Sequence, residues 1–199
     1  MSRVQLALAH SGVGGSTDYD LVPGLRRALP EGRTLRPAAV LVPLIARPTG
    51  PGVLLTRRSV LLRHHPGQIA FPGGKMDDTD ASIEAAALRE AEEEIGLQPA
   101  SVRVLGRLDT HETVTGFAVT PVVGTLAGDF DPSPHDAEVA EVFEVPLSFL
   151  LDTANLQIHE RDWQGRKRAY YAIPYGPYYV WGATARMLKG FADRMALVS

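Results

Sequence analysis

The chain contains no cysteine among its 199 residues, which excludes a disulfide framework and a thiol nucleophile. It also lacks an apolar run long enough to span a membrane, because the longest, Ala38–Ala46, is interrupted by Pro43. The apolar stretch Val4–Ala9 is too short and too weakly flanked for a secretory signal. We therefore expect a cytoplasmic protein with no membrane partner.

An excess of basic charge is lacking as well. The formal net charge is −3 at pH 7, whereas broad binding to nucleic acid needs a basic face. We therefore expect no nucleic-acid partner, and we expect an anionic substrate to be met by local arginines and metal rather than by the overall field. With 45% apolar residues, the chain has enough material for one well-buried domain and no clear room for two.

Hydrophobic periodicity and turn residues predict an α/β architecture. Strands are expected at residues 38–46, 52–58, 102–108, 117–126 and 139–145, with a hairpin of 156–160 and 168–173 across Gln164-Gly165. Helices are expected at residues 18–29, 82–95 and 181–196, and residues 11–17 are expected to form a mobile Gly/Ser-rich loop. Gly96 is expected to end the helix of residues 82–95.

The most informative segment joins the adjacent Gly73 and Gly74 to an acidic helix about fifteen residues later. Adjacent glycines form a turn that lets the backbone approach a ligand closely, because no Cβ is in the way. On the predicted helix, Glu90, Glu93 and Glu94 stand at i, i+3 and i+4 and share one face. Like charges packed together cost stability unless a cation neutralises them, and Mg²⁺ binds through carboxylates plus substrate phosphates. The pattern indicates a metal-dependent enzyme acting on a phosphate ester or anhydride.

A run of acidic residues is, in most sequences, only a solvated helix face. Two features favour the functional interpretation here. No lysine occurs in residues 82–95, and Arg89 is placed four residues before Glu93, where the two side chains pair. Such a pair would fix the helix and leave Glu90 and Glu94 free to bind metal.

The segment resembles the Nudix box, the loop–helix signature of the Nudix hydrolases, with the form G-x5-E-x7-R-E-U-x-E-E-x-G-U and U aliphatic. Gly74 opens the box, and its second half is filled in register by Arg89, Glu90, Ala91, Glu93, Glu94, Gly96 and Leu97. The middle departs, because Asp80 stands in place of the isolated Glu and eight residues rather than seven separate it from Arg89. This extra residue and the opening G-G-K-x-D-x-x-D, here residues 73–80, resemble the coenzyme A pyrophosphatase subfamily.

The preceding segment resembles the second signature of that subfamily, L-L-T-x-R-S-x-x-x-R-x-x-x-G-x-x-x-F-P-G-G. Every fixed position is filled, by Leu54, Leu55, Thr56, Arg58, Ser59, Arg63, Gly67, Phe71, Pro72, Gly73 and Gly74. Arginine matches phosphate bidentately, and coenzyme A carries a 3′-phosphate beside its diphosphate. Arg57 and Arg58 lie on opposite faces of the predicted strand, so we expect one to decorate only a solvated face. We favour Arg58 and Arg63 as functional.

The resemblance implies the Nudix fold, a mixed β-sheet sandwiched between helices (α/β/α), as a single domain over residues 1–199. Its core would span about residues 36–150, with an N-terminal helix and a C-terminal helical extension packed on it. The implied activity is metal-dependent hydrolysis of coenzyme A or a derivative to 4′-phosphopantetheine and adenosine 3′,5′-bisphosphate, with Mg²⁺ or Mn²⁺ as cofactor.

The resemblance also implies roles for individual residues. The metal would be held by Glu90, Glu94 and the backbone carbonyl of Gly74; the catalytic residues would be Glu93, Arg89 and Glu138; the substrate would contact Arg58, Ser59, Arg63, Gly67, Phe71 and Lys75. Glu138 matches a late acidic loop from which family members supply a general base, but a surface acid at a strand edge is an equal interpretation. Glu141 and Glu112 are reserve candidates.

Two alternatives remain open. The same chemistry could act on another nucleoside diphosphate, such as ADP-ribose, NADH or a capped RNA end, and only the segment of residues 54–71 speaks against this. A non-catalytic Nudix module that binds a nucleotide is the other, although such modules usually lack the box carboxylates. The aromatic residues between Tyr170 and Trp181 could stack on an adenine, but packing in the core or at the surface of a homo-oligomer is favoured.

Overall fold

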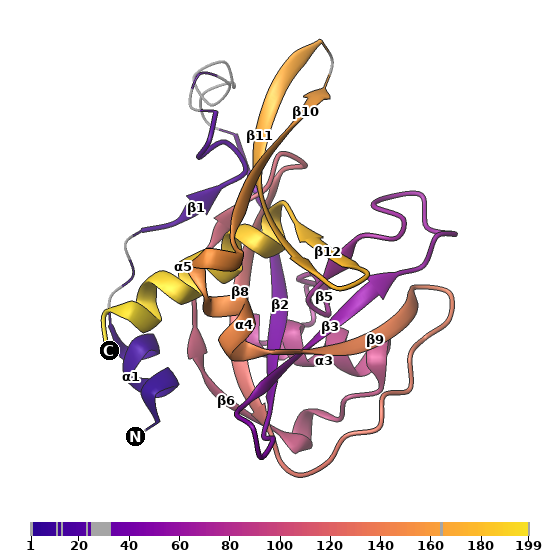
Figure 1. Cartoon of the computed structure of the whole chain (residues 1–199). Coiled ribbons are helices and arrows are strands. Elements are labelled where there is room, and N and C mark those ends of the chain that lie inside the picture. The colour runs from indigo at the N-terminus through magenta and orange to yellow at the C-terminus, as the bar shows by residue number, and fades with distance from the viewer. Residues whose placement is uncertain are drawn as a thin grey trace.

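The computed structural model describes residues 2–10, 12, 14–22, 24, 33–163 and 165–198 (Figure 1). The helices are α1 (Arg3–Ala9), α3 (Ile83–Ile95), α4 (Leu147–Leu151) and α5 (Ala183–Ala196), with 3₁₀ turns at Pro99–Ser101 and Thr153–Asn155. The strands are β1 (Ser16–Thr17), β2 (Arg36–Ile45), β3 (Gly52–Arg58), β4 (Ile69–Ala70), β5 (Gly73–Lys75), β6 (Val102–Arg107), β7 (His111–Glu112), β8 (Phe117–Leu126), β9 (Val139–Pro146), β10 (Gln157–Trp163), β11 (Arg166–Tyr175) and β12 (Tyr178–Trp181).

Strands β1 to β9 of the described residues form one mixed sheet with the order β1-β7-β8-β2-β3-β4. Strand β5 pairs with β2, β6 with β8, and β9 with β3. The two longest central strands, β2 and β8, run parallel, whereas β3 is antiparallel to β2. A second, antiparallel sheet is formed by β10, β11 and β12, and its β10–β11 hairpin projects from the top of the molecule (Figure 1).

The large sheet is buried on both faces. On β2, Ala39 and Leu41 point toward a hydrophobic core that includes the apolar face of α3. Val42 and Leu44 alternate with them and point into a second core that includes residues of α1, α4 and α5. A strand covered on both faces reads as a continuous apolar run, which is how the sequence of β2 reads. The predicted mixed sheet between helices is therefore confirmed.

Helix α3 owes its limits to local signals that the sequence contains. The Ser82 hydroxyl accepts the N–H of Ala85 and caps the first turn. Gly96 adopts the left-handed conformation, with φ 73°, and ends the helix as predicted. The face toward the sheet is lined by small residues such as Ala87 and Ala91, which are fully buried. Small side chains let the helix lie close to the sheet, so its glutamates reach the backbone of β5.

Glu84, in the first turn of α3, is hydrogen-bonded by Arg107 on β6, and this bonding lowers the pKa of Glu84 to about 2. A carboxyl whose pKa is lower in the folded than in the unfolded state stabilises the fold above the unfolded pKa, near 4.5. That contribution is lost as the pH falls from there to about 2. Both side chains are partly exposed, so the effect is small.

We therefore expect Glu84→Gln to lower the melting temperature at pH 7, and the difference from wild type to shrink as the pH falls toward 2. Thermal melts across this range measure it. Glu92→Gln, an exposed substitution of equal charge change on the same helix, is the matched control. A Glu84→Gln deficit that stays constant with pH would contradict the assignment.

Expectations at the N-terminal side of the sheet are corrected. Ser16 and Thr17, expected in a mobile loop, form the buried strand β1, which pairs in parallel with β7. Residues 18–21 form turns instead of the start of a helix. Their polar groups are used by tertiary contacts, because the Asp18 carboxylate accepts the N–H of Val114 at 2.8 Å. Position 23 and residues 25–29 of that expected helix lie outside the described residues.

The C-terminal helix begins at Ala183 and not at Trp181 as predicted. Trp181 ends β12, which pairs with β11, and Gly182 turns the chain with φ 64°. The predicted hairpin is confirmed and extended, because β10 and β11 pair from Gln157 with Ala172 to Trp163 with Arg166. Helix α1 was not predicted. No helix in the described part of the chain is long and apolar enough to cross a membrane.

Candidate active site

The two adjacent glycines form a strand, not the turn that was expected. Gly73 to Lys75 make up β5, which pairs antiparallel with Ala38–Val40 of β2. The glycines nevertheless provide close approach, because a Cβ on Gly74 would lie 2.6 Å from the carboxylate atoms of Glu90. The chain can therefore place α3 directly against β5 only because side chains are missing there.

Glu94 lies at the centre of this contact, with 3% of its surface exposed. One carboxylate oxygen accepts the backbone N–H of Gly73 at 3.1 Å, and the other lies 3.5 Å from Nη1 of Arg58. Burial raises the pKa of Glu94 to about 7, against the opposing effects of Gly73 and Arg58. The negative charges of Glu90 and Glu138 raise the pKa further. Without a cation, the site disfavours ionisation of this carboxyl group.

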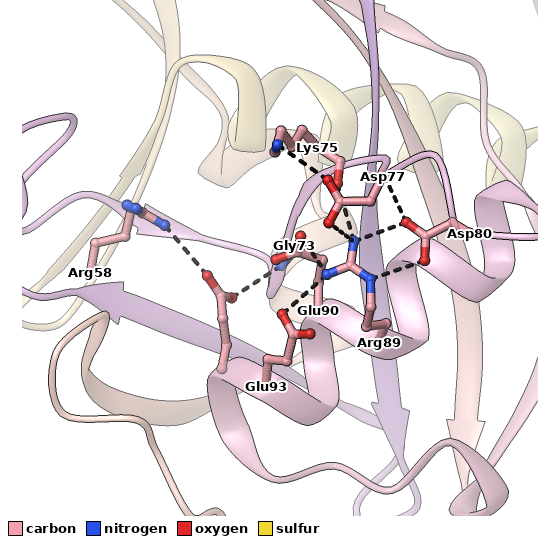
Figure 2. A network of polar contacts seen from close by, with 9 residues as sticks. Arg58, Gly73, Lys75, Asp77, Asp80, Arg89, Glu90 and Glu93 are labelled. Atoms are coloured by element: carbon pink, nitrogen blue, oxygen red, sulfur yellow. Dashed lines mark hydrogen bonds and ion pairs between the residues drawn. The ribbon is translucent and has the colours of Figure 1, made fainter.

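Arg89 organises the other side of the site (Figure 2). Its Nε and Nη2 each donate to Asp80 at 2.9 Å, a bidentate pair, and Nη1 donates to Glu90 and Glu93 at 3.1 Å. The predicted pair with Glu93 is confirmed. The same nitrogen also reaches Glu90, and the availability of Glu90 for metal stays a prediction. Hydrogen bonds from Arg89 also lower the pKa of Asp80.

Asp80 explains how the chain accommodates the extra residue of its box. The N–H of Asp77 donates to the Asp80 carboxylate at 2.8 Å, and the N–H of Asp80 donates to the Asp77 carbonyl at 3.0 Å. This turn fixes Asp80 facing Arg89, with only 5% of its side chain exposed. Asp80, which replaces the longer Glu of the box and stands one residue further from Arg89, is therefore the principal partner of Arg89.

Glu138 lies in the exposed turn just before β9. Its backbone carbonyl accepts the N–H of Ser59 at 2.8 Å, which ties this turn to the end of β3. The negative charge of Glu138 raises the pKa of both Glu90 and Glu94, so the three carboxylates are close enough to repel one another. Burial is the first cause of the raised pKa of Glu90, as it is for Glu94.

The donor set suits a hard divalent cation such as Mg²⁺. The described residues contain no group of three acidic or histidine side chains already arranged as a complete cage. Mg²⁺ does not require one, since it is usually held by one or two carboxylates, with waters and substrate phosphates in the other positions. A cation between Glu90 and Glu94 would favour the ionised forms that burial disfavours. The residues present therefore fit a metal, which Glu90 and Glu94 would hold.

A cleft of about 360 Å³ adjoins this site. Four of the predicted site residues line it, namely Arg58, Phe71, Gly74 and Lys75. Phe71 is 3% exposed and serves the core as well as the cleft wall. Lys75 is exposed and lies 3.2 Å from Asp77.

Three predicted substrate residues lie in the loop that joins β3 to β4, outside the cleft lining. Ser59 is buried, and its hydroxyl accepts the N–H of Leu61 at 3.4 Å. Gly67 has φ 69° and donates its N–H to the Arg58 carbonyl at 3.2 Å, which closes the loop. Arg63 is exposed. These contacts give Ser59 and Gly67 a role in shaping the loop, and contact of all three with substrate stays a prediction.

Part of the cleft lining was not predicted. It comes from the second sheet and the start of α5, and its second-sheet residues include Arg161, Arg168, Tyr170 and Trp181. The aromatic residues were noticed in the sequence but favoured as core packing. Arg161 gave no signal at all, because nothing local distinguishes it from other charged residues of a hairpin.

The contact between Gly74 and Glu90 leads to a prediction. We expect Gly74→Ala to weaken Mn²⁺ binding about tenfold or more, the scale seen when the support of a metal ligand is lost, because the added Cβ must displace the Glu90 carboxylate. Electron paramagnetic resonance measures the affinity. Gly190→Ala, on α5, is the matched control, with the new Cβ 3.7 Å from Arg186. Equal Mn²⁺ affinity in the two variants would show that Glu90 does not bind the ion.

Comparison with known proteins agrees with this geometry. The family model of the NUDIX domain matches residues 35–167. Over 160 residues, the chain is 48% identical to the "Uncharacterized Nudix hydrolase NudL" of Escherichia coli O7:K1, covering 79% of this chain and 81% of that protein. The chain is 49% identical to the NudL of Cronobacter sakazakii, again over 79% of this chain and 81% of that protein.

Among solved structures, the Nudix hydrolase RenU of M. smegmatis superposes with a TM-score of 0.50 at 26% identity, covering 59% of this chain and 74% of that one. The region matched by the family model contains the buried Glu94, the Arg89 network, and Arg58, Gly73 and Gly74 of the cleft lining. This chain belongs to the Nudix hydrolase family.

Proposed function

We propose that this Nudix hydrolase cleaves the diphosphate of coenzyme A or a derivative, giving 4′-phosphopantetheine and adenosine 3′,5′-bisphosphate. The observation that carries the proposal is the complete signature between Leu54 and Gly74. Two residues from distant positions of this signature meet at one carboxylate, because Arg58 and Gly73 both contact Glu94. The segment that resembles the coenzyme A pyrophosphatases is thus built into the same site as the box glutamates.

In the proposed mechanism, Glu90, Glu94 and the carbonyl of Gly74 would hold the divalent metal. A metal held there would supply neutralisation of the charge that develops on the diphosphate and a bound water of lowered pKa. Arg58 lines the cleft beside Glu94, where its guanidinium orients a substrate phosphate. Arg89 holds Glu90 in place by a hydrogen bond of 3.1 Å. Water then displaces one half of the substrate, with no covalent enzyme intermediate.

Glu138 is better placed than Glu93 to act as the general base. The Glu93 carboxylate accepts a hydrogen bond from Nη1 of Arg89 at 3.1 Å and is therefore already engaged with a residue of its own helix. The side chain of Glu138 makes no hydrogen bond or ion pair with the described residues, and its charge acts on both buried glutamates. We therefore assign proton acceptance to Glu138 and the positioning of Arg89 to Glu93.

We also propose that residues 1–199 act as one domain. Ala7 of α1, Phe191 of α5 and Val42 of β2 belong to the same hydrophobic core, so both ends of the chain pack on the sheet that carries the site.

The test is Mg²⁺-dependent turnover of coenzyme A beside 3′-dephospho-coenzyme A, ADP-ribose and NADH, with the products resolved by mass. The proposal expects adenosine 3′,5′-bisphosphate and phosphopantetheine, with a large loss of rate when the 3′-phosphate is removed. Preferential turnover of ADP-ribose or NADH would overturn the substrate and leave the hydrolase chemistry standing. Binding without turnover of any of the four would favour a non-catalytic module.

A further inference from the structure

The cleft is lined by several cationic side chains, and most of them are paired with a carboxylate. Arg58 lies beside Glu94, and Lys75 lies 3.2 Å from Asp77. Two arginines from β11 and α5 also line the cleft and are paired: Arg168 lies 3.5 Å from Asp18 and Arg186 lies 2.6 Å from Asp20. Arg161 is the exception, since this cleft-lining cation makes no ion pair with any residue of the described ranges.

Aromatic rings hold Arg161 instead of a carboxylate. Its guanidinium carbon lies 4.7 Å from the ring centroid of Trp181 and 5.9 Å from that of Tyr170. The Tyr170 and Trp181 rings in turn pack edge to face, with centroids 5.3 Å apart. A guanidinium seated on an aromatic face is fixed in place, while its N–H groups along the edge stay available to an anion. Phosphate matches that edge bidentately.

The strand pairing also favours an anion beside Arg161. Arg161 on β10 lies directly across from Arg168 on β11. Like charges directly opposite each other in a ladder are destabilising. Asp18 balances Arg168, whereas nothing in the described residues balances Arg161. A bound anion would supply the missing negative charge.

The position of Arg161 separates it from the hydrolytic site. Arg161 belongs to the second sheet and lines the cleft with Tyr170 and Trp181. The glutamates of α3 are not part of the cleft lining, and they lie against Gly73 and Gly74 of β5, which line the cleft. A substrate whose diphosphate lies at the glutamates could therefore present another group to the second sheet. That group meets a fixed cation with free donors.

We propose that Arg161, seated on Trp181, binds a phosphate of the substrate that is remote from the cleaved diphosphate, which in coenzyme A is the 3′-phosphate. The inference rests on the proposed function for the identity of the substrate. It assigns a specificity-determining residue that no sequence signature contains, in the part of the chain beyond the box.

The test compares kcat/KM for coenzyme A and 3′-dephospho-coenzyme A in wild type and Arg161→Gln. We expect the variant to lose about tenfold to a hundredfold on coenzyme A, the effect of one charged hydrogen bond, and to stay within about twofold on the dephospho substrate. Arg161→Lys keeps the charge without the planar fork, so its loss should be intermediate. Lys167→Gln is the matched control, since Lys167 lies on the same hairpin but outside the cleft lining.

Two results would overturn the proposal. The first is an equal loss on both substrates, which would mean that Arg161 only positions the hairpin. The second is a wild-type preference for coenzyme A over 3′-dephospho-coenzyme A in Arg161→Gln, together with the loss of that preference in Arg63→Gln. This result would place the remote phosphate at the exposed loop that contains Arg63.

A binding experiment tests the role of Arg161 independently of whether coenzyme A is the substrate. If wild type does not hydrolyse coenzyme A, the proposed function fails, and calorimetry on the metal-free protein still tests Arg161. We then expect wild type to bind adenosine 3′,5′-bisphosphate more tightly than adenosine 5′-monophosphate, and Arg161→Gln to lose that preference. A preference that persists in the variant, or is absent from wild type, contradicts the assignment.

Discussion

Replacing Glu94 by glutamine is expected to cut metal-dependent turnover at least about a hundredfold, the scale seen when a main electrostatic element of a site is removed. Glu94 is the most buried of the box carboxylates and lies between Gly73 and Arg58. A neutral amide keeps the shape but removes the charge that would hold the cation. The loss should appear in kcat and in Mn²⁺ affinity together, because both depend on that charge.

The fold should survive this substitution. In the absence of metal, the pKa of Glu94 is already raised to about 7, so at neutral pH much of the protein carries the uncharged acid, which glutamine resembles. The glutamine carbonyl can still accept the Gly73 N–H. Glu92→Gln, on the exposed side of the same helix, is the control and should retain full activity. Near-normal turnover by a folded Glu94→Gln protein would remove Glu94 from the metal site.

Arg89→Met is expected to lower turnover by about ten- to a hundredfold, the range seen when a residue supporting a metal ligand is lost, and also to lower the melting temperature. Arg89 is the single cation that hydrogen-bonds Asp80, Glu90 and Glu93 among the described residues. Its removal leaves the enclosed Asp80 carboxylate unpaired and lets Glu90 and Glu93 repel each other. The two defects are measured by steady-state kinetics and by thermal melts in the absence of metal.

Two further variants sharpen this prediction. Arg89→Lys keeps the charge but cannot make the bidentate contact with Asp80, so it should recover only part of both losses. Arg103→Met removes an exposed arginine of β6 that makes no ion pair within the described residues, and it should leave both quantities near wild type. An Arg89→Met protein with normal stability and activity would mean that the network in Figure 2 has no role in either.

Helix α3 shows what local sequence can establish. Ser82, the alanines and Gly96 act within one or two turns of themselves, so the limits of the helix and the shared face of its glutamates follow from the residues alone. The strand pattern of β2 is equally readable, because a strand buried on both faces must be apolar throughout.

The elements that were wrong or missed depend on distant partners. Gly73 and Gly74 read as a turn, but pairing with Ala38–Val40 makes them a strand. Asp80 read as a departure from the box, and only the fold shows that a turn from Asp77 returns its carboxylate to Arg89. Arg161 could not be found, because the rings that hold it, Tyr170 and Trp181, come from two other strands and the cleft it lines forms only in the fold.

We propose that the glutamates of α3 drive metal-dependent hydrolysis of the diphosphate of coenzyme A. The most direct measurement is product formation from coenzyme A by wild type and Glu94→Gln in parallel, with Mg²⁺ and with chelator. We predict adenosine 3′,5′-bisphosphate and phosphopantetheine from wild type with Mg²⁺ alone, and at least about a hundredfold less product from the variant. Equal product formation in chelator, or by the variant, would contradict the account.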